Sequence, residues 1–536
     1  MRGPVVIALS AAVLLGAWLP GQCAWLGLGA DAGRTGYTKE SPTLPMSTLW
    51  KFYYPDPENQ TTPAVQGGRV YFVASTWLFC LDQQDGSRKW EFDAKAPIRS
   101  SPLLVGNYVI FGDDAGALRA LDQASGAVKW QRLSQGAILA APLFYQGKVF
   151  VGTADKQVVA VDPNTGEQAW SFTTDSLVSL PLAAGGNILF ALDRSNYIYA
   201  LEAATGRLLW RGKSEQPLSL GPVVSQDVLF LVSGEFLYGM TLRGSKLWSI
   251  RSDRPLNYAP ATAGDLIYMT GSDGRIYALT ARSGAIRWVY SDPEISITSS
   301  PTVAGGVLLA GGSSGAVLAL DLTTGKLLWH CQERSLTTPL DEPGRQSAAS
   351  QPVFADGSLF LLSNDGNLSC FSPQAPDLTG PIIAEIGPSG RRVVSGQLPL
   401  AIQARIFDEG SGLRPDSIEI YFDGEKAKME KEPLSGTYYY IINGKKPKDA
   451  VEDGPHTVTI VASDYRGNMT TVAWKFTTDK SIVTPERLIS PELAAQLRMG
   501  KGGGASRTAA GAGRGAGFGG GTGGFRPGGG GGPGRR

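Results

Sequence analysis

The chain has 536 residues, a charged fraction of 18% and a formal net charge of +1. This length exceeds one ordinary hydrophobic core and predicts more than one domain. The near-zero charge argues against nucleic acid as a partner. Two histidines exclude a multi-histidine metal site, and four cysteines without a CxxC pair argue against a zinc cluster or disulfide framework.

Residues 1–24 have the features of a secretory signal peptide. Arg2 precedes an apolar stretch, Val5–Leu19, which is short for a membrane span, and small residues near its end offer a cleavage site. Cys23 leaves lipoprotein anchoring open as an alternative to plain cleavage, although Gln22 stands where a small residue is usual. No later segment has the length and apolar character of a transmembrane helix. We therefore predict an exported monomer that is periplasmic, displayed at the cell surface or secreted.

After a lead-in at residues 25–46, tryptophan recurs at intervals of 38–41 residues. A period in this range indicates a repeat architecture. The eight members are Trp50, Trp90, Trp130, Trp170, Trp210, Trp248, Trp288 and Trp329. An independent series of eight prolines opens the first strand of each unit, where proline costs no ladder hydrogen bond. Its members are Pro63, Pro102, Pro142, Pro181, Pro222, Pro260, Pro301 and Pro352.

One unit, residues 100–133, shows the content of each repeat. Short apolar runs at Leu103–Val105, Tyr108–Phe111, Leu118–Leu121 and 128–130 alternate with turn residues. Four short antiparallel strands per repeat are typical of a propeller blade. We therefore predict an all-β, eight-bladed propeller over residues 47–373. Trp50 precedes the first proline, so the strand Ser47–Tyr53 is expected to complete the blade that begins at Pro352.

The repeated residues are interpreted as structural. The tryptophans are expected to pack between blades rather than to form a ligand-binding ladder. Aspartates recur at the starts of turns that end in glycine, and we interpret them as turn caps rather than calcium ligands. These aspartates are Asp82, Asp122, Asp162 and Asp321.

The connection between the last two prolines is the longest of the series and adds a loop at residues 331–350. Long loops in compact domains tend to be either functional or disordered. We predict that this loop binds a partner through Glu333, Arg334, Asp341, Glu342 and Arg345. Arg99 and Arg254 are expected to lie on the same propeller face, with solvated surface as the alternative interpretation.

The units Leu118–Trp130, 159–170 and 318–329 resemble the pyrroloquinoline-quinone-like propeller repeat. The lead-in, with Trp25, Asp31 and Thr35-Gly36-Tyr37, is also similar to that family. The resemblance implies one of two kinds of protein. One is the quinoprotein dehydrogenases, which use the quinone and calcium. The other is non-enzymatic envelope proteins such as the propeller lipoprotein of the outer-membrane barrel-assembly machinery. Many of the dehydrogenases carry a vicinal Cys-Cys pair and some a haem motif, and this chain has neither.

Residues 376–478 lack the repeat and alternate in polarity over five predicted strands: Leu400–Phe407, Ser417–Phe422, Thr437–Ile442, His456–Ala462 and Thr471–Thr477. This pattern predicts an all-β sandwich. The segments 408–412 and 464–468 resemble those of bacterial immunoglobulin-like surface modules. Their acids are interpreted as turn-forming, with calcium binding as the alternative.

Residues 479–536 are expected to be a linker and a disordered tail rich in glycine and arginine. The basic tail suggests contact with an anionic wall or lipid surface. We predict a non-catalytic envelope scaffold without a cofactor, which engages an envelope or surface protein. The alternatives are a pyrroloquinoline-quinone-dependent dehydrogenase or quinone-binding sensor with calcium, and a carbohydrate-binding or carbohydrate-processing propeller.

Overall fold

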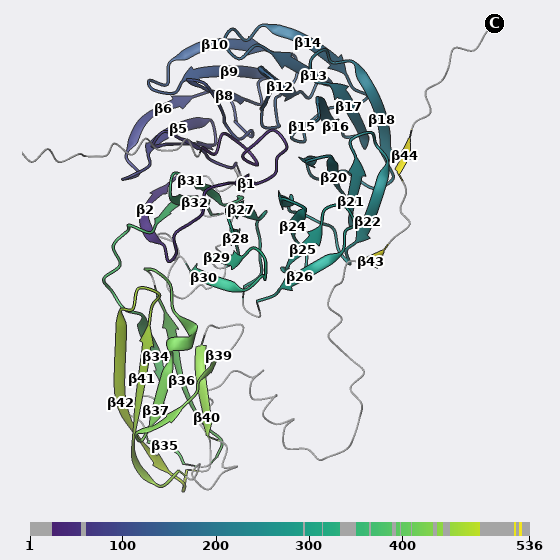
Figure 1. Ribbon diagram of the computed structural model, residues 1–536. Coiled ribbons are helices and arrows are strands. Elements are labelled where there is room, and N and C mark those ends of the chain that lie inside the picture. Colours follow the sequence, from purple (N-terminus) through teal and green to yellow (C-terminus); the bar gives the residue numbers. More distant parts are fainter. Residues whose placement is uncertain are drawn as a thin grey trace, which may run out of the picture.

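The protein consists of a β-propeller joined to a β-sandwich (Figure 1). The computed structural model describes residues 24–54, 61–292, 295–313, 315–332, 350–363, 366–388, 393–396, 398–408, 410–431, 437–442 and 451–482, with the backbone of 519–520 and 525–527. Within these ranges the one helical element is a 3-10 turn, η1 (Pro415–Ser417). No helix there has the length and apolar character needed to cross a bilayer. The predicted signal peptide lies outside the described residues, apart from its last residue.

Eight four-stranded antiparallel sheets form the propeller, which confirms the predicted blade number. From innermost to outermost strand, the first four blades are β3 (Ala64–Gln66), β4 (Arg69–Ala74), β5 (Trp77–Asp82), β6 (Arg88–Asp93); β7 (Leu103–Val105), β8 (Tyr108–Gly112), β9 (Ala117–Asp122), β10 (Val128–Leu133); β11 (Leu143–Tyr145), β12 (Lys148–Gly152), β13 (Gln157–Val161), β14 (Gln168–Thr173); and β15 (Ala183–Gly185), β16 (Ile188–Leu192), β17 (Tyr197–Glu202), β18 (Leu208–Ser214).

The other four blades are β19 (Val223–Ser225), β20 (Val228–Ser233), β21 (Phe236–Thr241), β22 (Lys246–Arg251); β23 (Ala261–Ala263), β24 (Leu266–Thr270), β25 (Ile276–Thr280), β26 (Ile286–Tyr290); β27 (Thr302–Ala304), β28 (Val307–Gly311), β29 (Ala316–Asp321), β30 (Leu327–Gln332); and β31 (Val353–Ala355), β32 (Ser358–Leu362), β33 (Asn367–Ser372), β2 (Ser47–Tyr53). β2 pairs antiparallel with β33, so the two ends of the propeller share blade 8. This shared sheet closes the ring and leaves no open edge between the first and last blades.

The core of the propeller lies between blades. Each pair of neighbouring blades shares one cluster of buried apolar side chains. The repeated tryptophans join the blades at their outer strands. Seven of them donate an indole hydrogen bond of 2.8–3.2 Å to a carbonyl in a turn of the following blade.

The turn glycine beneath each ring explains the Asp-to-Gly spacing. Gly126 has φ +72°, and a Cβ added there would lie 2.8 Å from the Trp90 ring. Asp122 opens the same turn, and its carboxylate accepts the backbone N–H groups of Ala124 and Ser125. Hydrogen bonds from Ser125 lower the pKa of Asp122. Aspartate therefore shapes the turn, and glycine lets the tryptophan of the preceding blade lie against it.

The sandwich comprises two sheets. One has the order β34 (Ile382–Gly387), β36 (Leu400–Phe407), β40 (Thr437–Ile442) and β39 (Glu430–Lys431); the other has β35 (Val393–Ser395), β42 (Met469–Asp479), β41 (Gly454–Ser463), β37 (Glu419–Phe422) and β38 (Glu425–Ala427). All five predicted strands are present, and the four others were not predicted. Ile402, Ile420 and Ile460 are fully buried between the sheets. The immunoglobulin-like identity stays a prediction.

The sandwich contacts blade 7. At this position blade 8 lacks the turn that joins the third and outermost strands in the other blades. β33 leads into the linker at residues 373–381 instead of turning back to an outer strand. Trp329 of β30 therefore donates its indole N–H to the carbonyl of Ser411 in the sandwich, at 2.7 Å. Tyr465 reaches His330 with its hydroxyl at 3.3 Å from Nδ1. A loop of the second domain thus takes the role that the next blade has elsewhere in the ring.

Two short strands of the tail were not predicted from its glycine-rich composition. β43 (Gly519–Gly520) pairs with β22, and β44 (Phe525–Pro527) pairs with β18, both antiparallel. They extend the outer edges of blades 5 and 4. The rest of residues 483–536 lies outside the described ranges.

Candidate functional site

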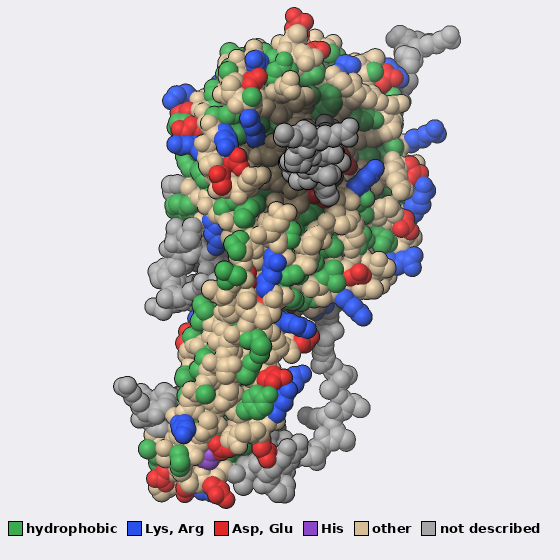
Figure 2. All heavy atoms as spheres, turned by 60° about the vertical axis from the view of Figure 1, so that its left-hand side comes forward, with side chains coloured by type: hydrophobic (Ala, Val, Ile, Leu, Met, Phe, Trp, Pro, Cys, Tyr) green, Lys and Arg blue, Asp and Glu red, His purple; other side chains and the backbone are tan. Residues whose placement is uncertain are grey.

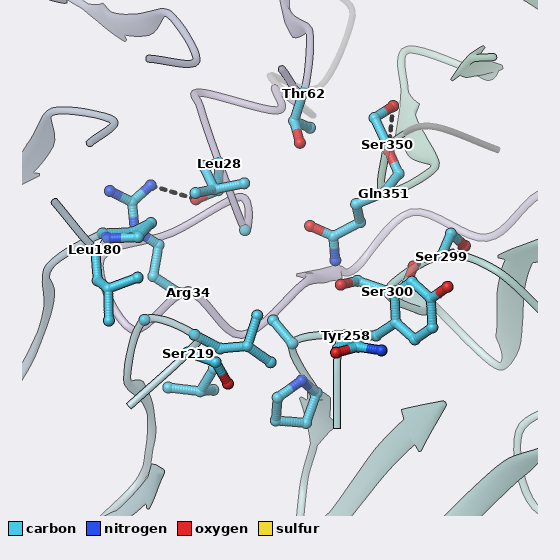
Figure 3. Close-up of a pocket in the computed structure, with 18 of the residues that line it drawn as sticks. Leu28, Arg34, Thr62, Leu180, Ser219, Tyr258, Ser299, Ser300, Ser350 and Gln351 are labelled. Atoms are coloured by element: carbon cyan, nitrogen blue, oxygen red, sulfur yellow. Dashed lines mark hydrogen bonds between the residues drawn. The ribbon is translucent and has the colours of Figure 1, made fainter. Parts of the chain in front are cut away.

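A cavity of about 530 Å³ opens at the centre of the propeller (Figure 3). Its wall is formed mainly by the loops that join the outermost strand of one blade to the innermost strand of the next. The wall residues are Thr62, Leu180, Pro181, Ser219, Leu220, Gly221, Pro222, Val223, Asn257, Tyr258, Ala259, Pro260, Thr298, Ser299, Ser300, Ser350 and Gln351. The lead-in supplies the remaining lining residues, Leu28, Gly29 and Arg34. Three of the repeated prolines, Pro181, Pro222 and Pro260, thus lie around one central space.

The lead-in runs around the inside of the ring and pairs with successive innermost strands. Such a strand has a blade neighbour on one side only, so backbone N–H groups facing the channel need another partner. Lead-in carbonyls accept the N–H groups of Val65, Leu104, Ala184, Val224, Thr262 and Val303, at 2.7–2.8 Å. β1 (Tyr37–Thr38) also pairs parallel with β27. The lead-in therefore serves as a common inner partner for six of the eight blades.

Arg34 anchors the lead-in to the third and fourth blades. The side chain is 6% exposed. Its guanidinium donates to the carbonyls of Leu28 (2.5 Å), Ala141 (3.0 Å), Pro142 (3.1 Å) and Leu182 (3.0 Å). Burial lowers the pKa of Arg34 to about 10, so the group keeps its charge at neutral pH. The planar five-donor fork suits a ring of carbonyls better than any other side chain.

Asp31 stabilises the turn of the lead-in beside Arg34. Its carboxylate accepts the backbone N–H of Thr35 at 3.0 Å and the Thr35 hydroxyl at 2.5 Å. Burial raises the pKa of Asp31, while Thr35 and the Arg34 charge oppose that rise. The hydrogen bonds between Asp31 and Thr35 therefore stabilise the local turn of the lead-in.

The cavity presents uncharged hydrogen-bonding groups. Figure 3 places Leu28, Arg34 and Leu180 on one side, with Gln351, Ser300 and Tyr258 on the other. Burial raises the pKa of Tyr258, so its hydroxyl is neutral at physiological pH. Gln351 donates its side-chain amide to the carbonyl of Pro301 at 2.8 Å. Among the lining residues that the structure describes, Arg34 is the one charged group, and none is a carboxylate.

The predicted partner-binding residues are placed only in part. Glu333, Arg334, Asp341, Glu342 and Arg345 lie outside the described residues. The last residue of their predicted loop, Ser350, lines the cavity.

Arg99 and Arg254 both lie in loops of the kind that forms the cavity wall. Arg99, between β6 and β7, pairs with Asp114 at 2.9 Å. Arg254 is exposed between β22 and β23, three residues before Asn257 of the cavity wall. The surface in Figure 2 shows Lys and Arg interspersed with Asp and Glu, so no single sign dominates that view. The role of these arginines in partner binding stays a prediction.

Sequence reasoning missed Arg34 and the path of the lead-in. The lead-in was noted only for its resemblance to the family, and a single arginine in a short irregular segment gives no periodic signal. The proline series was the available clue. It marks where each innermost strand begins, and those positions converge at the axis.

The chain matches the PQQ_2 family model, described as "Outer membrane protein assembly factor BamB", over residues 47–176, 105–195 and 194–388. These matches span more than half of the sequence. The chain belongs to this family. No curated protein is similar enough in sequence to be matched to it.

Several solved structures are similar to this chain. BamB from Moraxella catarrhalis is 19% identical, with a TM-score of 0.48, and the match covers 61% of this chain and 99% of that one. A europium-containing methanol dehydrogenase is 14% identical, with a TM-score of 0.53 and coverage of 63% and 89%. The quinohemoprotein alcohol dehydrogenase from Comamonas testosteroni is also 14% identical, with a TM-score of 0.53 and coverage of 66% and 82%. At these identities the likeness to the two dehydrogenases concerns the fold alone.

Proposed function

We propose that this protein is an exported, non-catalytic scaffold of the cell envelope. We further propose that its propeller binds a protein partner through the face that carries the central cavity. One observation supports this proposal above the others. The lead-in follows the inner strands around the ring, and the described cavity lining contains neutral hydrogen-bonding groups around an arginine that is already bound to four carbonyls.

Neutral serine, threonine and amide groups around a preformed pocket suit an inserted side chain or loop from another protein. Loops on a rigid scaffold commonly serve this purpose, because they vary while the blades stay fixed. The family description, an outer membrane protein assembly factor, supports the same assignment. The predicted signal peptide supports export, and the basic tail is proposed to contact an anionic wall or lipid surface.

The dehydrogenase alternative finds less support in the cavity. A site for the quinone and calcium needs carboxylate and amide ligands that converge in the funnel. The described lining contributes the amides of Asn257 and Gln351 but no carboxylate, and the Gln351 amide is bound to Pro301. A carbohydrate site would favour several exposed aromatic rings or paired carboxylates, whereas Tyr258 is the single aromatic residue in the described lining.

Site-specific photocrosslinking in intact cells tests the scaffold proposal. A photoreactive phenylalanine at Arg254 places the probe on the cavity face. The matched control replaces Arg243, an exposed arginine in the turn between β21 and β22, at the opposite end of the blade strands. We expect a discrete adduct with an envelope protein from position 254 and none from position 243. The charge reversal Arg254→Glu should weaken capture of that protein, while Arg243→Glu should not. Equal adducts from both positions, or none from either, would contradict the proposal.

A calorimetric titration of the full chain with pyrroloquinoline quinone, with and without calcium, tests the alternative. Our proposal expects no quinone-dependent heat in either condition. Micromolar binding of the quinone that requires calcium would replace the scaffold with a dehydrogenase or a quinone sensor.

A further inference from the structure

Three aspartates converge where the sandwich meets the propeller. Asp377 lies in the linker, Asp408 directly follows β36, and Asp464 directly follows β41. One carboxylate oxygen from each lies within 4.8 Å of the others. Asp408 is 4% exposed and Asp464 is fully buried. Three like charges are thus gathered in a site largely removed from water, which is unfavourable unless a cation or protons neutralise them.

Part of this arrangement is explained by turn formation, as the sequence predicted. Asp408 Oδ2 accepts the backbone N–H groups of Gly410 (3.0 Å) and Gly412 (2.8 Å). Asp377 Oδ2 accepts the N–H of Ser411 at 2.6 Å. Asp464 Oδ1 accepts the N–H of Asn468 at 2.9 Å, and its Oδ2 accepts the side-chain amide of Asn468 at 2.7 Å. Asp377 Oδ1 accepts the backbone N–H and the hydroxyl of Thr379 at 3.4 and 3.5 Å. These bonds shape the loops and use every carboxylate oxygen of the three aspartates except Asp408 Oδ1.

Two buried oxygens in the same loop are left over. Asp408 Oδ1 and Ser411 Oγ have no hydrogen-bond partner among the described residues. Buried polar atoms in native proteins nearly always have a partner, so each orphan needs an explanation. The convergence of three carboxylates and the buried, unpartnered Asp408 Oδ1 together indicate a missing cation.

We propose that Asp377, Asp408 and Asp464 bind one calcium ion. All three side chains offer oxygen, which calcium prefers, and the cluster contains no histidine or cysteine. Calcium holds its oxygens at about 2.3–2.6 Å, so ligands on opposite sides of one ion lie up to about 5 Å apart. The spacing of the three carboxylate oxygens fits this range. The unpartnered Asp408 Oδ1 accounts for one ligand, and the ion explains why this oxygen is buried without a hydrogen bond.

The ion would fasten the sandwich to the propeller. It joins the linker to two sandwich loops, and one of these loops carries Ser411. The Ser411 carbonyl accepts the indole N–H of Trp329, and its N–H is held by Asp377. In the same loop, Gly412 has φ +96°, and a Cβ there would lie 2.2 Å from the His330 carbonyl oxygen. Calcium would therefore hold in place the loop that substitutes for the missing turn of blade 8.

Calorimetric titration of the EDTA-treated, desalted full chain with calcium chloride tests the site, with magnesium chloride in parallel. We expect one calcium ion to bind with a dissociation constant below about 100 μM and magnesium to bind more weakly. Asp408→Asn and Asp464→Asn should each weaken calcium binding at least tenfold. The matched control is Asp453→Asn at the opposite end of β41, where the carboxylate accepts the N–H of Lys480 at 2.7 Å. This variant should bind calcium like the unmodified chain.

A second measurement decides the matter even if a cluster variant does not fold. Leu378, next to Asp377, is 87% exposed and is a substrate position for chymotrypsin. Calcium should slow cleavage of the unmodified chain at Leu378 at least fivefold, and magnesium should not. The proposal is overturned if the unmodified chain binds no calcium, or if calcium leaves cleavage at Leu378 unchanged. Calcium binding that persists in both Asp408→Asn and Asp464→Asn would also overturn it.

Discussion

Replacing Arg34 with methionine provides the strongest test of how the lead-in holds the propeller together. Methionine keeps much of the apolar stem but removes all four hydrogen bonds to the carbonyls of Leu28, Ala141, Pro142 and Leu182. Three of these bonds are buried, and the one to Leu28 is partly buried. The third blade would lose its side-chain link to the lead-in.

Two opposing effects set the magnitude. Hydrogen bonds to a charged group contribute about 1.5–3 kcal/mol each, so four of them amount to roughly 6–12 kcal/mol. Burying the guanidinium opposes this. The fall of its pKa to about 10 corresponds to a cost of about 3 kcal/mol. Water entering from the cavity would satisfy some of the abandoned carbonyls. We therefore expect Arg34→Met to lower the free energy of unfolding by about 3–5 kcal/mol.

Guanidinium chloride unfolding of the full chain, followed by tryptophan fluorescence, measures this loss. Arg34→Lys should be intermediate, because it keeps the charge but cannot contact four carbonyls at once. Arg99→Met is the matched control, since Arg99 is an exposed arginine whose ion pair with Asp114 should contribute at most about 1 kcal/mol. If Arg34→Met and Arg99→Met lose the same stability, the lead-in does not anchor the blades as described.

Three further outcomes are expected. Gly126→Ala should lower the free energy of unfolding by about 2–3 kcal/mol, because the new methyl group strains a positive φ and meets the Trp90 ring. The control Gly106→Ala, with φ +57° and open space around it, should lower it by about 1 kcal/mol. Equal losses in chemical unfolding would show that the ring contact contributes nothing. Burial lowers the pKa of His330 to about 4, with a smaller lowering from Lys431 and an opposing effect of Asp292. The unfolded state therefore binds more protons than the folded state between about pH 4 and 6.5. The free energy of unfolding is unaffected by His330 above pH 6.5 and falls as the pH decreases through this interval. Relative to His330→Gln, the native chain should lose about 2 kcal/mol between pH 7 and pH 5, and parallel pH profiles would contradict this. Burial raises the pKa of the Cys80 thiol to about 11 and that of the Cys370 thiol to about 12, and Cys331 is also buried, so Ellman's reagent at pH 8 should modify these three thiols only after unfolding; labelling of Cys80 in the folded chain would contradict the packing between blades 1 and 2.

Much of the fold was readable in the repeats because each blade is specified by local signals. The unit at residues 100–133 shows why. Its predicted strands coincide with β7 to β10 to within three residues at each end, because alternating apolar runs and turn residues act over a few positions. The same local reasoning located five strands of the sandwich. It missed short strands such as β38 and β39, whose sequences carry no apolar alternation.

The candidate site was less accessible to prediction. The loops around the cavity are polar and irregular, so neither periodicity nor a motif marks Ser219, Asn257 or Gln351 as neighbours. The longest loop was recognised from the proline spacing, but its charged residues lie outside the described part of the chain. The acids at Asp408 and Asp464 were recognised as turn formers. Their proximity to Asp377 was not, because the linker gives no indication of where it passes.

The sequence by itself determined the number of blades, the strands within each blade and the packing role of the tryptophans. These properties depend on neighbours a few residues away or on regular repetition, so they can be predicted from the sequence. Only the tertiary structure decided which groups meet across the ring. The lead-in follows the innermost strands around the ring because these strands need hydrogen-bond partners on the side that faces the channel. The sandwich docks on Trp329 because blade 8 lacks the turn that its indole would otherwise contact. Contacts of this kind arise from closing a ring, and no local pattern in the sequence records them.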